Sequence, residues 1–443
     1  MTTMLMLIQK NTMVMEMMNL RLLLILLFLL LVTRPTSQEL LDVAQPPSTD
    51  AGCGCETPPS DDDANPSDFP NLLQYNAYKV IQRFKLTITC DPNNVTATWV
   101  GNQPCTYTGF ACETPPDRKN TPTIASVDFN GFHLCAPTLS GFLDQLPDLA
   151  IFHANSNSFS GTLPNLTSLP FFYELDVSNN LLSGQFPTNL LTLDELLFLD
   201  IRFNSFAGSV PAGIFQLGLG VLFLNNNGFS QPLPASLGAS PVAYLTLANN
   251  GFTGSIPASI CNSSNTLIEV LFLNNRLSGC LPPEIGLLQK ATVFDAGANH
   301  ITGTIPLSFG CLKKVEQLNL AGNLLYGHVP SVVCNLAETG SLMNLSLSEN
   351  YFTSIGISCW DLIDNKVLDV SRNCIVGLPN QRPLLECARF LLRPKHCLLS
   401  AYIPCPLNHP DSSDDVPPLP APAAKPTKQA SVTYNAIHNT HSK

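Results

Sequence analysis

The chain is 443 residues long, with 45% hydrophobic residues, only 12% charged residues and a formal net charge of −11 at neutral pH. A chain of this composition can bury a large core and fits a long folded array. Its fifteen cysteines include no pair of CxxC motifs at zinc-ribbon spacing, which argues against a zinc site and for disulfide bonds formed in an oxidising compartment.

Residues 1–37 are predicted to be a signal peptide. Residues 20–32 form an apolar run with Arg21 close to its start, which suits the hydrophobic region of a signal peptide and is too short to span a membrane. No second apolar run of spanning length follows it in the sequence. We therefore expect a secreted protein without a membrane span.

Two segments precede the main pattern of the chain. Residues 38–64 mix Pro, Ser and Thr with three consecutive aspartates, and they predict an acidic, Pro-rich linker that is too polar to build a core. Residues 65–122 begin with apolar residues at helical spacing, which predict a helix. Three cysteines and a tryptophan follow that helix: Cys90, Trp99, Cys105 and Cys112. This second segment is predicted to be an N-terminal cap held by disulfides.

From residue 123 to residue 380 the sequence repeats. Asparagines recur at intervals of 23 to 27 residues: Asn157, Asn180, Asn204, Asn227, Asn250, Asn275, Asn299, Asn323, Asn350 and Asn373. Apolar residues stand three and five positions before each asparagine, as in the leucine-rich repeat pattern. One repeat cannot bury its own apolar face, so the repeats must stack. The pattern predicts an α/β solenoid, a plant-type extracellular horseshoe of about eleven repeats, with each Asn turned inward to bond backbone groups.

A C-terminal cap is expected over residues 381–410, because the open end of a solenoid exposes an apolar cross-section that must be covered. Residues 411–443 form a Pro-containing tail with small residues, which is expected to be extended or disordered. The cysteines that are candidates for disulfide bonds are Cys105, Cys112, Cys311, Cys334, Cys387 and Cys397.

One disulfide is predicted inside the array. Cys311 and Cys334 occupy nearly equivalent places on successive repeats, and a repeat spacing of about 4.8 Å would bring them within disulfide reach. The alternative is two buried free thiols. An odd number of cysteines leaves at least one thiol without a partner in the chain, which allows a disulfide-linked dimer. Cys53 and Cys55 could serve as a redox or dimer contact, or form an ordinary local or cap-linked disulfide.

Strand alternation identifies the residues that should face the concave side, because residues between the inward leucines point outward. Near the N-terminal end these residues are acidic, and farther along they are apolar. The candidate ligand-binding residues are Asp128, His153, Glu174, Asp176, Phe198, Asp200, Val221, Phe223, Tyr244, Leu271 and Asp295. Arg202 is the only basic residue close to the acidic ones on this face.

An exposed apolar strip beside an acidic patch is typical of a binding surface, and aromatic residues often dominate its energy. The alternative is scattered surface hydrophobicity and an ordinary solvated acidic face. A binding surface of this sign favours a basic partner with apolar anchors, such as a cationic peptide. Nucleic acid is disfavoured because the face carries the wrong charge.

Four Asn-x-Ser/Thr sequons predict glycosylation of a secreted chain, at Asn94, Asn165, Asn262 and Asn344. A glycan on Asn344 would shield the C-terminal end of the concave face. The alternative is that this sequon is unoccupied.

Sequence motifs of catalysis are absent: there is no Gly-x-Ser-x-Gly, no His-Glu-x-x-His and no phosphate-binding loop. His153, with nearby Glu174 and Asp176, is the only candidate acid–base cluster, and such a histidine is more often a binding contact. Asp176 and Asp200 could resemble the carboxylate pair of a glycosidase, but an open sheet gives little enclosure to tune their pKa values. We expect a protein that is not an enzyme and needs no metal or cofactor.

The cap residues and the repeats together resemble the leucine-rich repeat extensin proteins of plant cell walls. The similarity covers residues 65 to 405, including the segment 271–280 and this set of cap residues: Asp68, Phe69, Tyr75, Cys90, Trp99, Gly101, Cys105, Gly109 and Cys112. The resemblance implies a secreted wall protein whose repeats bind basic, cysteine-rich rapid alkalinisation factor peptides. It also implies a Ser-Pro-rich extensin tail. This chain departs from that pattern, because no run of Ser followed by three or more prolines occurs.

Two functions are therefore open. The first is an apoplastic module that binds basic signalling peptides in cell-wall growth. The second is a protein similar to the polygalacturonase-inhibiting repeat proteins, which would bind a wall hydrolase or a wall polysaccharide. The net negative charge argues against direct binding of an acidic pectin unless a basic peptide bridges the two.

Overall fold

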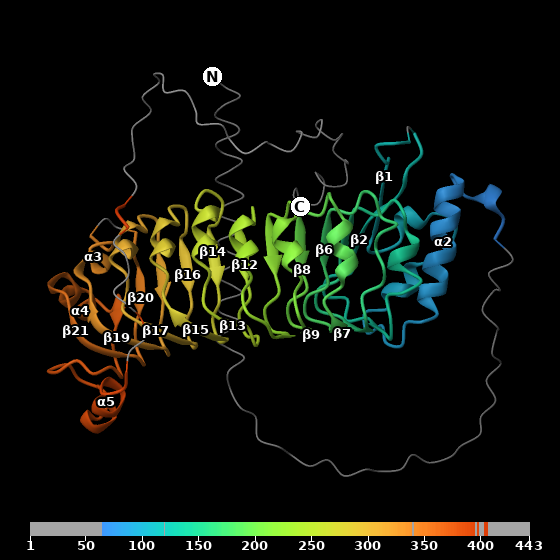
Figure 1. The fold of residues 1–443 in the computed structure, drawn as a ribbon. Coiled ribbons are helices and arrows are strands. Elements are labelled where there is room, and N and C mark those ends of the chain that lie inside the picture. Colours follow the sequence, from blue (N-terminus) through green and yellow to red (C-terminus); the bar gives the residue numbers. More distant parts are fainter. Residues whose placement is uncertain (1–63, 119, 339–340, 395–396, 398–402, 406–443) are drawn as a thin grey trace, which may run out of the picture. The chain divides into compact units, whose positions relative to one another are not determined.

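The computed structural model describes residues 64–118, 120–338, 341–394, 397 and 403–405. The chain divides into two compact units, Met1–Pro58 and Pro59–Lys443, and every described residue belongs to the second. The expected signal peptide, the linker apart from Ala64, Cys53, Cys55 and the tail lie outside the described residues, so those expectations stay predictions. Figure 1 shows the described part as a stack of repeats.

A helical segment and a β-hairpin open the described part. The short helix η1 (Pro66–Asp68) leads to α2 (Leu72–Lys85), which begins where the Asn71 side chain accepts a hydrogen bond from the Gln74 N–H. The short helices η2 (Val95–Thr98) and η3 (Pro104–Thr106) follow. Strand β1 (Phe110–Glu113) then pairs antiparallel with β2 (Thr123–Asp128).

The buried face of α2 packs onto the first repeats. The ring of Phe84 stacks on Phe142 with 3.9 Å between ring centres, and Trp99 is fully buried beside it. The disulfides Cys90–Cys135 and Cys105–Cys112 hold the loops around these rings. This segment therefore covers the apolar end of the stack, as a solenoid cap must.

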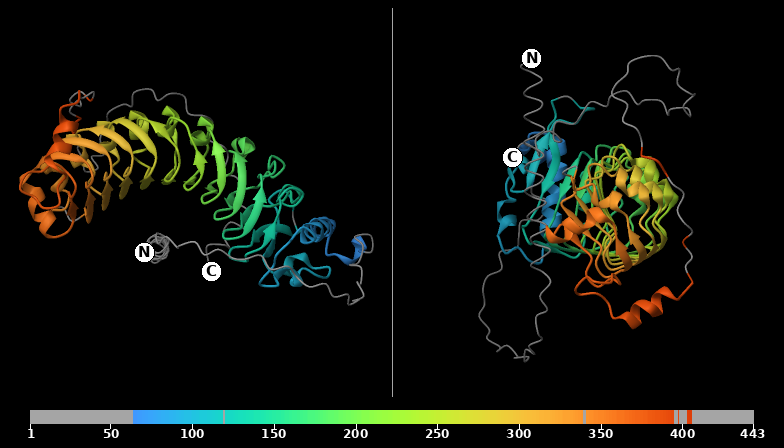
Figure 2. Two further views of the ribbon diagram at one scale, coloured as in Figure 1. Left: turned by 90° about the horizontal axis from the view of Figure 1, so that it is seen from below. Right: turned by 90° about the vertical axis from the view of Figure 1, so that its left-hand side faces the viewer.

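In the described residues, the main sheet is parallel from β2 onward and takes one strand from each repeat. Its further strands are β4 (Ile151–His153), β6 (Glu174–Asp176), β8 (Phe198–Asp200), β10 (Val221–Phe223), β12 (Tyr244–Thr246), β14 (Glu269–Leu271), β16 (Val293–Asp295), β18 (Gln317–Asn319), β20 (Asn344–Ser346) and β22 (Leu368–Asp369). Figure 2 shows these repeats following one another along a curved array.

The second strand of each repeat, which follows the turn after the main strand, belongs to one of two smaller sheets in the described residues. The first consists of β3 (Cys135–Ala136), β5 (Ser158–Gly161), β7 (Leu181–Gln185), β9 (Ser205–Gly208) and β11 (Gly228–Phe229). The second consists of β13 (Thr253–Gly254), β15 (Arg276–Cys280), β17 (His300–Gly303), β19 (Leu324–Val329) and β21 (Tyr351–Ile355). In the described residues, each repeat before the last thus makes two strand segments, and the last makes only β22.

Short helices close the repeats on the side away from the main sheet. They are η4 (Leu143–Gln145), η5 (Thr188–Thr192), η6 (Ala212–Gln216), η7 (Ala235–Ala239), η8 (Ala258–Ser263), η9 (Pro283–Leu287), η10 (Leu307–Cys311), α3 (Ser331–Cys334), η11 (Ile357–Cys359) and α4 (Trp360–Asp364). Helix α5 (Leu384–Leu391) follows the last repeat, and its Phe390 ring stacks on Tyr351 at 3.6 Å.

The recurring asparagines turn inward, as predicted. The amide nitrogen of Asn180 lies within 3.1 Å of the carbonyl oxygens of Ala154, Val177 and Ser178, and its Oδ1 accepts a hydrogen bond from the Phe159 N–H. Each Asn side chain therefore bonds its own repeat and the one before it. The predicted α/β solenoid of the leucine-rich repeat type is confirmed.

The predicted disulfide between Cys311 and Cys334 is wrong. Cys334 bonds Cys359, its equivalent on the following repeat, and Cys311 bonds Cys405 from beyond the repeats. Cysteines at equivalent positions of neighbouring repeats can therefore form a disulfide, but the pair that does so is Cys334 and Cys359, one repeat after the predicted pair. The other candidates also pair: Cys387 with Cys374, and Cys397 with Cys280. Among the described cysteines Cys261 is free and half-buried.

Candidate functional site

The strands of the main sheet align the candidate residues in two rows. One row lies at the end of each strand and contains Asp128, His153, Asp176, Asp200, Phe223, Thr246, Leu271, Asp295, Asn319, Ser346 and Asp369. The second row, two residues earlier, contains Ser126, Ile151, Glu174, Phe198, Val221, Tyr244, Glu269, Val293, Gln317 and Asn344. The order of residues is the one that strand alternation predicts.

His153 and Glu174 form a pair on neighbouring strands. His153 Nε2 lies 2.9 Å from Glu174 Oε2, and Glu174 is only 5% exposed. Burial lowers the pKa of His153, but the hydrogen bond and charge of Glu174 and the charges of Asp176 and Asp128 outweigh it. The net pKa of His153 is therefore raised, which favours the imidazolium form.

Asp200 is not a solvent-facing carboxylate, contrary to expectation. Its side chain is fully buried, and Oδ2 lies 3.0 Å from Arg202 Nε. Burial and the charge of Asp176 raise its pKa well above the ordinary value, although Arg202 opposes them. Side chains on the inner face of a curved sheet converge, so neighbours cover one another. Glu174 is buried for the same reason, and the open part of the acidic patch is smaller than expected.

Several of the aspartates also have a structural task. Oδ1 of Asp128, Asp176, Asp200, Asp295 and Asp369 accepts a hydrogen bond from the backbone N–H two residues later, and Asn319 does the same. This local bond stabilises the turn that follows each strand. The recurrence of Asp or Asn at one repeat position is a sequence signal for this turn, and the concave-face interpretation did not use it.

The apolar residues of the face form a half-buried strip, interrupted by Thr246 and Glu269, rather than a row of free side chains. The rings of Phe198 and Phe223 meet edge to face at 6.3 Å, and His153 lies 6.4 Å from Phe198. Arg202 lies over the Phe223 ring at 5.0 Å. Val221, Tyr244, Leu271 and Val293 continue the strip, each half-buried.

Asp295 ends this strip at its C-terminal side. Burial raises the pKa of its carboxyl group, although hydrogen bonds from the Gly297 N–H and from the side chain of Asn319 act in the opposite direction. Asp128 and Asp176 lie at the other end. Neither forms an ion pair with a Lys or Arg among the described residues. The combined surface is a negatively charged edge beside packed aromatic rings.

The four sequons are exposed in the structure, at Asn94, Asn165, Asn262 and Asn344. Asn344 lies on β20 of the main sheet, next to Gln317. Their glycosylation stays a prediction. In the described part of the chain, no three His, Cys, Asp or Glu side chains are grouped to hold a metal ion. The same described residues include no helix with the length and apolarity that crossing a bilayer requires.

Comparisons with known proteins agree with this architecture. Residues 242–263 match the family model described as Leucine Rich Repeat. Among solved structures, the ectodomain of the Arabidopsis thaliana receptor kinase GASSHO1/SCHENGEN3, in complex with CASPARIAN STRIP INTEGRITY FACTOR 2, is 23% identical. It has a TM-score of 0.56 and covers 67% of this chain and 41% of its own. This likeness establishes the fold alone.

A second solved structure is that of the Arabidopsis receptor kinase HAESA with the peptide hormone IDA and the co-receptor SERK1. It is 25% identical with a TM-score of 0.50, and the match covers 67% of this chain and 58% of that one. The fold is thus shared with the ectodomains of plant receptor kinases.

The curated relatives are more similar in sequence. The chain is 41% and 43% identical to Leucine-rich repeat extensin-like proteins 4 and 3 of Arabidopsis thaliana, but covers only 19% and 12% of their lengths. It is 37% identical over 330 residues to Leucine-rich repeat extensin-like protein 7 of Arabidopsis thaliana. That alignment covers 74% of this chain and 75% of the relative. The chain belongs to the leucine-rich repeat extensin-like family.

Proposed function

We propose that the chain is a secreted protein of the plant cell wall or apoplast that binds a small basic peptide on its concave face. The peptides that fit best are cysteine-rich signals of the rapid alkalinisation factor type, which act in cell-wall growth. One observation carries the proposal: Asp176, a carboxylate that forms no ion pair among the described residues, lies on the strand next to the packed rings of Phe198 and Phe223, and the similarly unpaired Asp128 lies two strands before it. Such a surface attracts a cation and also offers an apolar anchor point.

The curvature of the main sheet supports the same proposal. A peptide lying across the strands of the sheet would contact the acidic residues near the N-terminal end first. Farther along it would contact the apolar residues Val221, Tyr244 and Leu271. The HAESA ectodomain, which shares the fold, was solved with a peptide hormone bound. The similarity supports a binding role and leaves the identity of the peptide to experiment.

The test is a binding measurement on the full secreted, glycosylated chain. A panel of basic cysteine-rich plant peptides, including rapid alkalinisation factors, is titrated at low and at physiological salt. We expect binding that weakens as salt rises, because exposed charges are screened. Absence of binding across the panel would contradict the proposal. It would favour the second candidate, a polygalacturonase-inhibitor-like protein that engages a wall hydrolase or polysaccharide, which the same assay can test with those ligands.

A further inference from the structure

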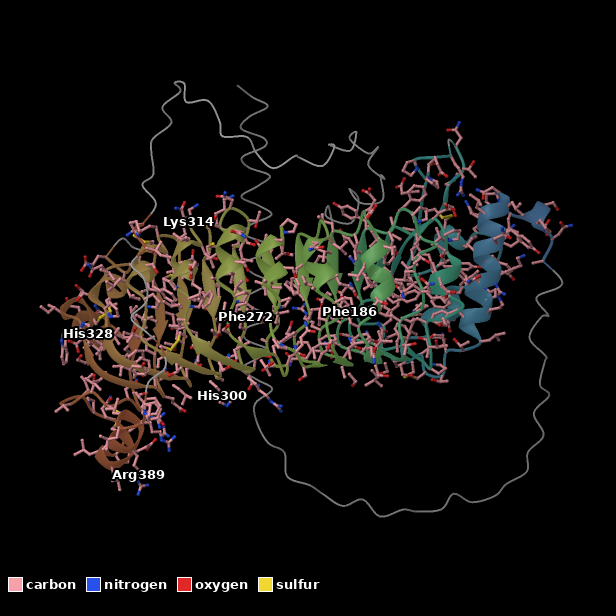
Figure 3. The ribbon with its side chains drawn as sticks, in the orientation of Figure 1. Phe186, Phe272, His300, Lys314, His328 and Arg389 are labelled. Atoms are coloured by element: carbon pink, nitrogen blue, oxygen red, sulfur yellow. A yellow bond between two sulfur atoms is a disulfide. The ribbon has the colours of Figure 1, made fainter. Side chains whose placement is uncertain are left out.

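A second candidate site lies away from the concave aromatic strip. It is a cavity of about 290 Å³ beside the segments that lead into β14, β16 and β18. Its walls are formed by Asn265, Gln289, Lys290, Lys313, Lys314 and the disulfide Cys311–Cys405. Figure 3 shows Lys314 at the rim of the array, apart from the core residues Phe186 and Phe272 and from Arg389 on helix α5.

The cavity is positively charged although the chain as a whole carries −11. Lys290, Lys313 and Lys314 are all exposed, and none of them forms an ion pair with a described residue. Among the residues that the structure describes, no carboxylate lines the cavity. Glu316 is the acidic residue nearest to Lys314 in the sequence, and its negative charge contributes to the raised pKa of Glu269. Three ammonium groups and two side-chain amides can therefore donate hydrogen bonds to one anionic ligand.

The donors are arranged with the period of the solenoid. Because Glu269, Val293 and Gln317 are in register, the residues four positions before them, Asn265, Gln289 and Lys313, occupy equivalent places on three repeats. Lys290 and Lys314 are equivalent in the same way, three positions before Val293 and Gln317. Neighbouring repeats are spaced by about 4.8 Å. Donors at a regular spacing suit a ligand whose acidic groups also repeat along a chain.

The chemistry of the residues that line the cavity favours a sugar over a peptide as the ligand. Apart from the disulfide, every described lining residue is Lys, Asn or Gln, so this part of the lining has no aromatic or branched aliphatic side chain to hold the apolar anchors that an acidic peptide uses. The disulfide also fixes one wall, since Cys405 is bonded to Cys311, the last residue of η10. We propose that this cavity binds an anionic oligosaccharide, with uronic acid carboxylates on successive sugars, running across the repeats. Net charge alone argued against such a ligand, and the local charge reverses that argument.

The test uses the full secreted chain and oligogalacturonate, with the fully methyl-esterified oligosaccharide of the same length as the uncharged control. We expect the acid form to bind and the ester not to bind. Lys290→Gln and Lys314→Gln should each weaken binding about tenfold, because each removes a charged hydrogen-bond donor. Lys366→Gln, which removes an exposed lysine elsewhere, should leave the affinity unchanged. Circular dichroism checks that each variant is folded.

Three further binding measurements test whether the cavity is the binding site and whether its ligand is a saccharide. Equal binding of oligogalacturonate by wild type and by both cavity variants would overturn the proposal. Equally tight binding of poly-glutamate, lost in the same variants, would overturn the assignment to a saccharide and leave a general polyanion site. The concave-site variant Asp176→Asn should not change saccharide binding, so failure of this site and failure of the peptide site are distinguishable.

Discussion

Arg202 Nε lies 3.0 Å from Oδ2 of the buried Asp200, and the same guanidinium lies 5.0 Å from the centre of the Phe223 ring. Arg202 therefore joins the acidic residues of the concave face to its aromatic strip. The Asp200 side chain is 1% exposed, whereas that of Arg202 is 22% exposed. Removing the two partners should consequently have different effects.

Substitution of Arg202 by Gln should destabilise the protein by about 3 kcal/mol at pH 8, because it leaves a buried carboxylate without its cation. At pH 5 the loss should be smaller, since the raised pKa of Asp200 lets the carboxyl group take up a proton. Asp200→Asn should destabilise the protein less at both pH values. Asn keeps the oxygen that accepts the hydrogen bond from the backbone N–H of Arg202, and the Arg202 side chain can turn towards solvent. Urea unfolding of the variants measures these changes, and equal losses for both variants would contradict this account.

The concave cluster also predicts how stability depends on pH. The native pKa of Asp200 is raised, so the stability that its bound proton provides falls as pH rises from the ordinary carboxyl value through the native value. The native pKa of His153 is raised too, so its contribution is complete below pH 6.5 and is lost as pH rises through the native value. The free energy of unfolding should therefore decrease from mildly acidic to mildly alkaline pH.

The His153→Gln variant isolates one half of that dependence. It should flatten the part of the decrease that lies above pH 6.5 and comes from His153, whereas Asp200→Asn should reduce the part that comes from the raised pKa of Asp200. His133→Gln, at an exposed histidine away from this cluster, is the control. A steeper decrease in the His153 variant than in wild type would refute the assignment.

The inward asparagines should dominate the stability of single repeats. Asn180→Asp has the same shape but replaces an amide donor that faces three carbonyl oxygens by a carboxylate. We expect a loss of about 3 kcal/mol, because buried acceptors lose their partner beside a new buried charge. Asn130→Asp is the matched control, since Asn130 uses only its oxygen, which accepts from the Asn155 N–H. An unfolding midpoint that is lowered equally in both variants would contradict the structural role of the inward asparagines.

Phe203 is an aromatic residue in the left-handed region, with φ of +51°, at the position before the inward Asn204. Asn226, Asn249 and Asn274 occupy the equivalent position and are linked by hydrogen bonds between their side chains. Phe203→Asn should stabilise the protein by about 1 kcal/mol, because Asn tolerates this backbone conformation better than a bulky residue. Phe203→Val should destabilise it. An unfolding midpoint below wild type for the Asn variant would show that the Phe ring makes contacts that outweigh the strain.

The repeat spacing was enough to predict the solenoid and the strand register. Asn180 and its equivalents bond the backbone as expected, because the bond is local and recurs in every repeat. The pairing of Cys311 with Cys405 was not predictable in the same way, since it depends on how residues beyond the repeats return to them.

Exposure was the weaker part of the sequence-based prediction. Strand alternation correctly orders Glu174 and Asp200 on the concave face, but it does not report how closely the neighbouring side chains pack over them. The hydrogen bond to His153 and the contact with Arg202 come from adjacent strands and turns. The cavity of Lys290 and Lys314 was missed because the overall negative charge was averaged over the whole chain.

The most direct test of the central claim is the affinity of a rapid alkalinisation factor peptide for Asp176→Asn and for Asp369→Asn. Both aspartates lie in the same row and accept the same turn hydrogen bond, which Asn preserves. Asp176 lies beside the aromatic pair, whereas Asp369 lies on the last strand. We predict at least a fivefold weaker affinity for the first variant and wild-type affinity for the second. Equal affinities for both variants and wild type would contradict peptide binding at this site.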